Sequence, residues 1–430
     1  MPIRALHLAN QLAAQWKPPG IIEKRQLSLL QELVHASYAN TTAWRCLMQR
    51  AGVRPDDIKT LKDIERLPVV GKEDLLEFSR DERTNSTAGG AEHATSIATS
   101  GSSGAPYEFD VERPYDLWRK AQYLRPYVTN GRRPWHNMLR LTALTENGPP
   151  GRHLWRPFPE RRVHCTSDIS LQIAELCDRR PTFVQGYPSA LRCLAFELVA
   201  RGIETPYVRT VFTDSELLTP DTRILIEQAF GAPVLDIFGT FETDNIGYQC
   251  SRDSDYHVTT DSVIAEVHSD GGPVVNQDGD LVVTVLRGRM TPYIRYNLRD
   301  QVRLLPSSCA CGRRFPLMKI VAGRSVDMVM LRDGKHESPM SMTYSMIQFF
   351  DFVREYQIIQ NDIDRFTVRI VPSIAITDSE KSRILDTIQA HHPDAAFTIE
   401  PVRELPRTRA AKLKAFVNEI PAARRNEHGN

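Results

Sequence analysis

The sequence predicts an α/β protein with a large N-terminal domain and a small, mobile α+β C-terminal domain. Helical stretches alternate with short β-branched segments between residues 163 and 240, which is typical of parallel sheets. Short strands separated by glycine-rich turns fill residues 257–305 and indicate a small antiparallel, barrel-like subdomain. A mixed pattern follows Gly323. Because 430 residues exceed the usual size of a single core, we expect two domains, 1–322 and 323–430.

The elements can be placed by their periodicity. An apolar period of helical spacing covers residues 21–50, residues 107–111 alternate as in a strand, and residues 114–130 form an aromatic-faced helix. Gly202 and Gly231 are the expected stops of two later helices. In the parallel region, helices are predicted at 170–180, 189–202 and 219–231, and strands at 181–184, 208–213 and 234–238. In the C-terminal domain, strands are predicted at 326–331, 356–360, 366–372 and 395–402, and a helix at 379–392.

Composition argues against several classes of protein. A net charge of +1 disfavours nucleic-acid binding, which usually needs a basic excess. No apolar run approaches the roughly 20 residues that span a bilayer, and the N-terminus lacks a signal-peptide pattern. We therefore expect a cytoplasmic protein without nucleic-acid or membrane partners. Seven cysteines without a secretion signal argue against a disulfide framework, so a cysteine cluster is expected to bind metal or to act in catalysis.

A serine- and glycine-rich loop follows the apolar pair Ile97-Ala98. Glycines let the backbone approach a ligand closely, and N–H and O–H groups can bind phosphate oxygens. The spacing is not that of a Walker A loop. Taken alone, the loop predicts either a polyphosphate-binding segment or an ordinary surface loop. Its residues are Thr99, Ser100, Gly101, Ser102, Ser103 and Gly104.

A second candidate segment, Asp236–Glu242, ends a predicted buried strand. Ligands of open α/β sheets bind at the carboxyl ends of strands. Phe238 beside Gly239 can stack on a base, and Glu242, two residues after Thr240, can hold a hydrated Mg²⁺. The alternative is a strand-end turn with a solvated glutamate.

Two further segments carry charged residues. Asp300 at a strand end can accept both hydroxyls of a ribose, and Arg324 can neutralise a phosphate. The alternative is a surface ion pair, which contributes little to stability. Residues 404–414 place several cations, including Lys412, near the C-terminus, and a solvated basic tail is the alternative there.

Taken together and in this order, the segments resemble the motifs of the adenylate-forming superfamily of acyl-CoA synthetases, especially its phenylacetate–CoA ligase and CapK-like branch. The resemblance extends from about residue 60 to residue 420. It implies an ATP-dependent ligase that converts a small carboxylic acid, aromatic acids included, into an acyl adenylate and pyrophosphate and then into an acyl-CoA thioester. The motifs are TSGSSGAP at 99–106, DIFGTFE at 236–242, RYNLRDQVRLLPSSCACGRR at 295–314, GRSVDM at 323–328 and AAKLKAF at 410–416.

The resemblance also implies a role for each matching residue. Lys412 would reach the carboxylate and the α-phosphate as charge builds in the displacement. Thr99–Gly104 would bind the β- and γ-phosphates of ATP, and Glu242 would bind Mg²⁺. Phe238, in the motif that also contains Asp236, Gly239 and Thr240, would stack on adenine near the turn formed by Asp214, Ser215 and Glu216. Asp300 would bind the ribose, and Arg324 the ribose–phosphate region.

Three departures from the family pattern keep two alternatives open. Ala105 stands where a lysine often follows the second glycine, Val326 stands at the usual hinge position, and Ala411 replaces a glycine. A β-branched hinge residue resists the rotation that many relatives use between half-reactions. The acyl acceptor can therefore be an amine, a hydroxyl or a carrier-protein thiol instead of CoA. A non-catalytic nucleotide-binding protein is the second alternative.

Two further sites are predicted. Cys250, His257, Cys309 and Cys311 match a structural Cys₃His zinc site, and similar cysteines recur in the branch that the chain resembles. Free cysteines beside a solvated histidine are the alternative. For the acyl pocket, the candidates are Tyr187 and Pro188 at a predicted strand end together with Trp135 and His136, with aromatic core packing as the alternative for each. A homodimer is the oligomeric state that we consider.

Overall fold

The computed structural model of the chain forms two compact units, each built from two separate segments. The first unit contains residues 1–131 and 237–321, and the second unit contains residues 132–236 and 322–430. The break at 321/322 lies beside the predicted boundary at 322/323, whereas the other two breaks were not predicted. The division into domains 1–322 and 323–430 stays a prediction. The structure describes residues 2–98, 107–143, 157–269, 272–306, 308–324, 328–333, 335–408 and 411–421.

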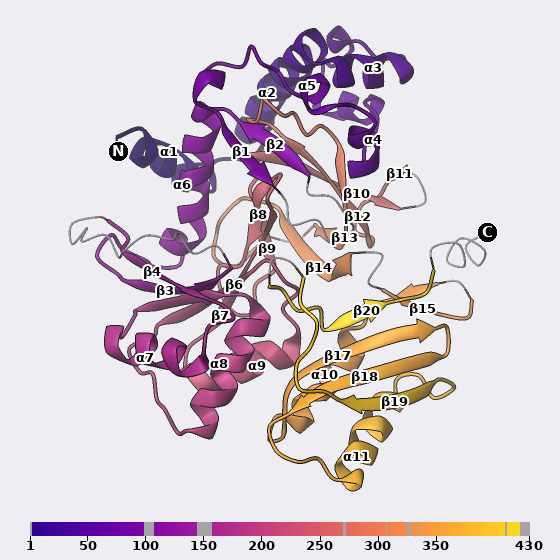
Figure 1. Ribbon diagram of the computed structural model, residues 1–430. Coiled ribbons are helices and arrows are strands. Elements are labelled where there is room, and N and C mark those ends of the chain that lie inside the picture. Colours follow the sequence, from indigo (N-terminus) through magenta and orange to yellow (C-terminus); the bar gives the residue numbers. More distant parts are fainter. Residues whose placement is uncertain are drawn as a thin grey trace. The chain divides into compact units, whose positions relative to one another are not determined.

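Helices dominate the N-terminal segment of the first unit (Figure 1). Strands β1 (Thr95–Ala98) and β2 (Glu108–Val111) pair antiparallel within it. The helical period predicted over residues 21–50 is divided between α2 and α3, which Thr41 separates in an extended conformation. The helices are α1 (Pro2–Ala14), α2 (Pro19–Asn40), α3 (Thr42–Arg50), α4 (Lys72–Leu76), α5 (Arg80–Arg83) and α6 (Arg113–Thr129).

An antiparallel sheet forms the other segment of the first unit. Its strands follow the order β11-β10-β12-β13-β14-β9-β8. The predicted antiparallel subdomain is confirmed, but the described strands lie in an open order that does not close into a barrel. The strands are β8 (Asp244–Tyr248), β9 (Tyr256–Val258), β10 (Val263–Ser269), β11 (Gly272–Pro273), β12 (Gly279–Val285), β13 (Tyr296–Leu305) and β14 (Leu317–Arg324).

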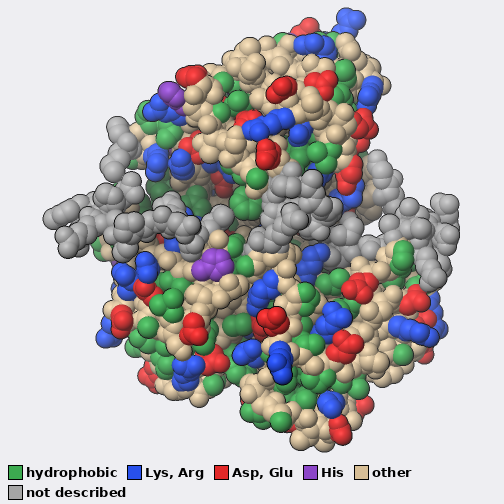
Figure 2. Space-filling view, in the orientation of Figure 1, with side chains coloured by type: hydrophobic (Ala, Val, Ile, Leu, Met, Phe, Trp, Pro, Cys, Tyr) green, Lys and Arg blue, Asp and Glu red, His purple; other side chains and the backbone are tan. Residues whose placement is uncertain are grey.

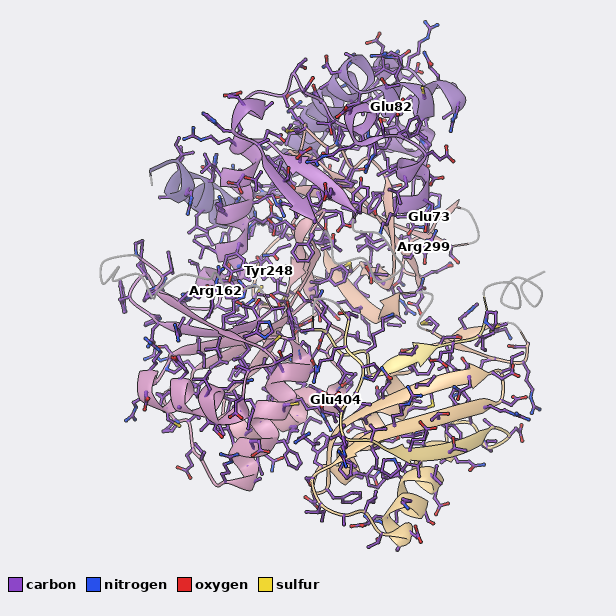
Figure 3. All side chains as sticks on the ribbon, viewed as in Figure 1. Glu73, Glu82, Arg162, Tyr248, Arg299 and Glu404 are labelled. Atoms are coloured by element: carbon purple, nitrogen blue, oxygen red, sulfur yellow. The ribbon has the colours of Figure 1, made fainter. Side chains whose placement is uncertain are left out.

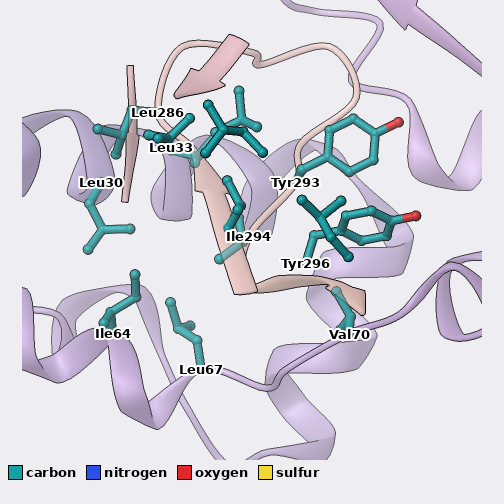
Figure 4. Packing of buried hydrophobic residues seen from close by; sticks show 14 of the residues in the cluster. Leu30, Leu33, Ile64, Leu67, Val70, Leu286, Tyr293, Ile294 and Tyr296 are labelled. Atoms are coloured by element: carbon teal, nitrogen blue, oxygen red, sulfur yellow. The ribbon is translucent and has the colours of Figure 1, made fainter. Parts of the chain in front are cut away.

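The core of the first unit joins this sheet to the N-terminal helices. Leu30 of α2 and Ile294, just before β13, are fully buried in one cluster of apolar side chains (Figure 4). Val70 donates its N–H to the carbonyl of Arg295 at 3.0 Å and accepts the N–H of Asn297 at 2.9 Å. The segment before α4 is therefore fixed to β13 by its backbone as well as by apolar packing.

A parallel sheet with three helices forms the first segment of the second unit. Parallel pairings join β4 to β3, β3 to β5 and β5 to β6, and β7 follows β6 in the order. The helices α7, α8 and α9 lie on one face of this sheet (Figure 1). The predicted alternation is confirmed, and α9 ends as predicted at Gly231, which is left-handed (φ 60°). The elements are β3 (Met138–Thr142), β4 (Glu160–His164), α7 (Ile169–Arg179), β5 (Phe183–Gly186), α8 (Pro188–Ala200), β6 (Thr210–Asp214), α9 (Pro220–Phe230) and the first three residues of β7 (Val234–Thr240), whose last four residues belong to the first unit.

The C-terminal segment of the second unit contains a four-stranded sheet in the order β19-β18-β17-β20. Its central pair, β17 and β18, is antiparallel, and both outer strands join parallel. The predicted α+β arrangement is therefore confirmed. The elements are β15 (Val329–Met330), β16 (His336–Glu337), α10 (Met340–Ser345), β17 (Val353–Asp362), β18 (Arg365–Pro372), α11 (Asp378–Gln389), β19 (Ala396–Pro401) and β20 (Phe416–Asn418).

The surface agrees with the near-neutral composition. Figure 2 shows Lys and Arg side chains interspersed with Asp and Glu over the visible face. Within the described part of the chain, no helix has both the length and the apolar character that crossing a membrane requires.

Candidate active site

Tyr187 and Pro188 follow the carboxyl end of β5 in the second unit. A Cβ atom at Gly186, the last residue of β5, would lie 3.0 Å from the Cβ of Leu141, so the close approach of β3 favours glycine there. Pro188 begins α8, where its missing N–H is not needed. Tyr187 is buried, and this burial raises its pKa. The turn thus holds Tyr187 at the edge of the sheet where ligands of open α/β folds bind.

Glu216 lies two residues beyond β6, after a turn at Ser215 with a φ of 70°. Its carboxylate accepts the N–H of Ser189 at 2.9 Å, the hydroxyl of Ser189 at 3.0 Å and the N–H of Leu413 at 2.7 Å. Burial raises the pKa of Glu216 to about 7. The family resemblance implies a place beside adenine, whereas in the structure this carboxylate binds the segment that carries Lys412.

Lys412 lies beside Tyr187 and is hydrogen-bonded to Thr408. Thr408 donates its N–H to the carbonyl of Lys412 at 2.9 Å, and Lys412 donates its N–H to the hydroxyl of Thr408 at 3.2 Å. Ala411 has a φ of 58°, a conformation that costs alanine more than the glycine of the family pattern. The ammonium nitrogen of Lys412 lies 5.8 Å from the centroid of the Tyr187 ring. A cation therefore stands at the carboxyl edge of the parallel strands.

Arg407 anchors the same segment from its other end. Its Nη1 lies 3.2 Å from the hydroxyl of Ser189, and its Nη2 pairs with the carboxylate of Glu355 on β17. Glu404, labelled in Figure 3, lies three residues earlier on this segment. Glu216 and Arg407 both contact Ser189 at the start of α8. The segment that carries Lys412 is therefore attached to α8 on both sides of the lysine.

Asp214 and Asp236, both predicted to lie near the nucleotide, are engaged within the sheet. Gln185 donates to the carboxylate of Asp214 at 2.6 Å, and Arg140 lies 3.6 Å from it. Asp236 is buried and accepts a hydrogen bond from the hydroxyl of Thr213. These contacts fix the positions of neighbouring strands.

Trp135 and His136 do not lie with Tyr187. They precede β3, and the His136 ring packs 5.5 Å from the ring of Phe183, the first residue of β5. Because β3 and β5 are parallel, this is the amino-terminal edge of the sheet, opposite to the edge that carries Tyr187. Trp135 is 74% exposed. The structure therefore does not bring the four predicted acyl-contact residues together.

In the first unit, the last four residues of β7 form a hairpin with β8. The register shifts between Phe238 and Gly239, and a Cβ atom at Gly239 would lie 2.1 Å from the carbonyl oxygen of Asp244. The hairpin therefore requires glycine at this position. Phe238 is half-buried against the apolar core, and the hydroxyl of Thr240 lies 3.0 Å from that of Thr243.

Glu242 lies in the turn of this hairpin. Arg119 of α6 fixes the turn through the carboxylate of Asp244 at 3.2 Å. Glu242 is half-buried and forms no ion pair with any residue that the structure describes. Burial raises the pKa of Tyr107, and the charge of Glu242 adds to this effect. A carboxylate without a cationic partner fits Mg²⁺, which proteins usually hold through one or two carboxylates and the substrate phosphates.

Asp300 lies in a bulge of β13. Between two regular pairs, Leu298, Arg299 and Asp300 together oppose Leu281 of β12. Arg299 is left-handed (φ 60°) and binds the carboxylate of Glu73 at 3.1 Å (Figure 3). Bulges of this kind redirect side chains and are common beside active sites.

Some predicted residues cannot be placed. The loop Thr99–Gly104 with Ala105, and the hinge residue Val326, lie outside the described residues. Arg324 ends β14, and its side chain is likewise outside the description.

The four predicted zinc ligands converge within the first unit. Their ligand atoms all lie within 4.8 Å of one another. Sγ of Cys250 lies 3.5 Å from Sγ of Cys309, and Sγ of Cys311 lies 3.3 Å from Nε2 of His257. A tetrahedral zinc with bonds of about 2.3 Å to sulfur and about 2.0 Å to nitrogen separates its ligand atoms by roughly 3.5 Å. Burial lowers the pKa of His257 to about 4, so the imidazole is neutral, as a metal ligand must be.

Sequence reasoning missed the residues that hold the lysine segment. Arg407 was part of the predicted basic tail, but its partner Glu355 lies 52 residues earlier, on another strand. Ser189 carries no motif, although its place at the start of α8 exposes a backbone N–H that needs a partner. Among the residues that hold the lysine segment, only Glu216 could be singled out from the sequence, because it is a carboxylate that follows a predicted strand end.

The chain is similar to several characterised proteins. Residues 332–419 match the family described as CapK C-terminal domain. The phenylacetate-coenzyme A ligase of Pseudomonas putida is 26% identical over 363 residues, 78% of either chain. The enzyme of the same name from Thermus thermophilus is 25% identical over 421 residues, 93% of either chain. Protein CapK of Staphylococcus aureus is 23% identical and covers 84% of this chain and 81% of its own.

Solved structures agree with the fold. A 2-hydroxyisobutyryl-CoA ligase in its postadenylation state has a TM-score of 0.78 at 19% identity, with 96% of this chain and 92% of that chain covered. An anthranilate CoA ligase has a TM-score of 0.54 at 17% identity, with 74% and 65% covered. At these identities the likeness establishes the fold.

Proposed function

We propose that this chain, a member of the adenylate-forming superfamily, activates a small carboxylic acid with ATP and transfers the acyl group to CoA. Its relatives named phenylacetate-coenzyme A ligase align over as much as 93% of its length. The observation that carries the proposal is the docking of Lys412 above Tyr187 at the carboxyl edge of β5 and β6. This is the edge at which open α/β sheets bind their ligands.

In the first half-reaction, an oxygen of the substrate carboxylate attacks the α-phosphorus of ATP. The bond from this phosphorus to its bridging oxygen breaks, and pyrophosphate leaves with the electron pair. Negative charge grows on the oxygens around phosphorus, and the ammonium group of Lys412 offsets it. In the second half-reaction, the sulfur of CoA attacks the acyl carbon, the thiol loses its proton and AMP leaves.

The roles of the nucleotide-binding residues are proposed from the family resemblance. Glu242 would hold Mg²⁺, which neutralises phosphate charge when bound. Its carboxylate is partly exposed and has no ion-pair partner among the described residues, which supports this role. Thr99–Gly104 would hold the phosphates, Phe238 the adenine, Asp300 the ribose and Arg324 the ribose–phosphate region.

Tyr187 and Pro188 are proposed to line the acyl site. Their position beside Lys412 supports this role, whereas the position of Trp135 and His136 at the other edge of the sheet does not support theirs. Phenylacetate is the first acid to test because several relatives carry its name. The homodimer and the cytoplasmic location remain predictions, and light scattering of the purified chain would test the first.

The function can be tested by assaying pyrophosphate release with ATP, Mg²⁺ and a panel of aryl and short-chain acids, with and without CoA. We expect release with at least one acid and a CoA thioester detectable by mass spectrometry. Pyrophosphate release without a CoA thioester, together with an acylated amine or carrier-protein thiol, would show that CoA is not the acyl acceptor. No release with any acid would contradict the proposal.

We also propose that Cys250, His257, Cys309 and Cys311 hold a structural zinc ion. We expect purified protein to contain about one zinc per chain, and Cys309→Ser to lose most of it and to unfold at a lower temperature, because structural zinc contributes directly to folding. Metal analysis and thermal unfolding would measure both effects. Cys177→Ser is the matched control, since Cys177 is an exposed cysteine outside the cluster. Equal zinc content in the two variants would contradict the assignment.

A further inference from the structure

Arg192 is a buried cation of the second unit to which the proposed reaction gives no role. It lies on α8, three residues after Ser189 and therefore on the same face of the helix. Its Nη1 donates to Oδ2 of Asp221 at 3.0 Å, and the two side chains are 4% and 0% exposed. Asp221 lies in the first turn of α9. A buried ion pair therefore joins α8 to α9.

The same guanidinium group binds the start of strand β17. Its Nε donates to the carbonyl of Arg354 at 3.1 Å, and its Nη2 donates to the carbonyl of Val353 at 3.5 Å. Tyr356, also on β17, donates its hydroxyl to Oδ2 of Asp221 at 3.2 Å. Burial raises the pKa of Tyr356 well above its ordinary value, so the hydroxyl keeps the proton that it donates. Strand β17 is thus attached to both helices.

Strand β17 in turn holds the segment that carries Lys412. Before the lysine, Arg407 pairs with the carboxylate of Glu355. After the lysine, Gln357 donates to the carbonyl of Lys414 at 3.0 Å, and β20 pairs parallel with β17. Glu355 and Gln357 are both buried. The position of Lys412 therefore depends on where β17 lies.

The ion pair is poorly suited to stabilising the fold. Within the described part of the chain, Oδ1 of Asp221 is buried and accepts no hydrogen bond. Moving two charges out of water is costly, and their attraction offsets this cost only when the remaining lone pairs are satisfied as well. A buried ion pair can instead specify one arrangement of the elements that it joins. The arrangement specified by this pair is that of β17 on α8 and α9.

The helix that holds β17 begins directly after Tyr187 of the proposed acyl site. We propose that Arg192, oriented by its ion pair with Asp221, positions Lys412 for acyl-adenylate formation. Arg192 is buried, so it acts through β17 and not by contact with the reactants. The inference rests on the proposed function, which assigns Lys412 to the first half-reaction.

The test measures the two half-reactions separately. Arg192→Gln should lower the maximal rate of pyrophosphate release by about 10–10²-fold, since a misplacement of about 1 Å costs that much, while KM for ATP and for the acid changes little. Thioester formation from CoA and supplied phenylacetyl adenylate, or the adenylate of whichever acid the parent protein uses, should stay close to the parent rate. Arg201→Gln is the control, because Arg201 follows the same helix and pairs with Glu197 at 2.9 Å on the surface.

Tyr356→Phe removes only the hydroxyl that binds Asp221, so it tests the network even if Arg192→Gln does not fold. It should lower pyrophosphate release in the same selective way, by a smaller factor. In both variants, amide hydrogen exchange of residues 411–418 should be faster than in the parent protein, because local exchange reports local opening. Exchange of β5 should be unchanged.

An equal fall in both half-reactions would assign Arg192 to stability alone and overturn the proposal. An unchanged rate of pyrophosphate release would overturn it as well. If the parent protein releases no pyrophosphate with any acid, the proposed function fails, and hydrogen exchange then tests the network separately. In that case, faster exchange of residues 411–418 would still show that the network holds the lysine segment, whereas unchanged exchange in both variants would overturn the inference.

Discussion

Replacing Lys412 with alanine is expected to lower the rate of acyl-adenylate formation by about 10²–10³-fold, the usual cost of removing one preorganised charged group. The structure gives the reason. The ammonium nitrogen stands 5.8 Å from the Tyr187 ring on a segment that Glu216 and Arg407 anchor to the start of α8. A group held this firmly offsets the transition-state charge without paying the entropy of ordering a free side chain.

The loss should appear in pyrophosphate release and leave the melting temperature nearly unchanged, because the anchors of the segment are the carboxylate of Glu216 and the N–H of Leu413. Lys335→Ala is a matched control in the same unit. Lys335 is exposed, and its ion-pair partner within the described ranges is Asp333, at 2.7 Å, so its loss should not alter the rate. Equal rates of pyrophosphate release for Lys412→Ala and the parent protein would contradict the proposed role of Lys412 in acyl-adenylate formation.

Local patterns in the sequence predicted the helices α7, α8 and α9 and the strands β5, β6 and β7 of the parallel sheet, whereas β3 and β4 were not predicted. The strands β5, β6 and β7 contain short apolar runs, and Gly231 ends α9 in the conformation that glycine favours. Local sequence patterns do not show at which edge of the sheet a residue that flanks a strand will lie. Trp135 and His136 were therefore assigned to the acyl site, although they precede β3 and lie at the amino-terminal edge.

Contacts between distant segments were beyond the reach of sequence patterns. The zinc ligands could be proposed because cysteine and histidine are distinctive, and the fold brings the two pairs together. The sequence could not identify the partners of Glu216, since two of its three contacts are with backbone N–H groups, of Ser189 and Leu413, which every residue type except proline possesses. The composition of a site is thus easier to predict than its backbone contacts.

The carboxyl group of Glu216 should make stability depend on pH in an unusual direction. Burial raises its pKa from 4.5 to about 7. Between these values the unfolded chain has released the proton and the folded chain still holds it, so stability falls as pH rises through this window. At pH 8 both states are ionised, and the buried charge then costs roughly 3 kcal/mol relative to pH 4.5. Arg407 and Cys165 are the titratable groups that interact with it.

Glu216→Gln should remove this dependence, because a neutral amide resembles the protonated acid at every pH. We expect the variant to match the parent protein near pH 5 and to exceed its resistance to urea at pH 8. The urea midpoints of the parent protein and of Glu216→Gln are to be measured from pH 5 to 8. Their difference at each pH reports the titration of Glu216 alone, because the other titratable groups are present in both proteins. Glu380→Gln is the control: hydrogen bonds from Thr377 lower the pKa of Glu380 from 4.5, so its stabilisation is lost only below about pH 4.5, and the midpoint of this variant should differ from that of the parent protein by a nearly constant amount from pH 5 to 8. Parallel curves for the parent protein and Glu216→Gln would mean that Glu216 titrates at its ordinary pKa, and that the carboxylate holding the Lys412 segment is ionised throughout.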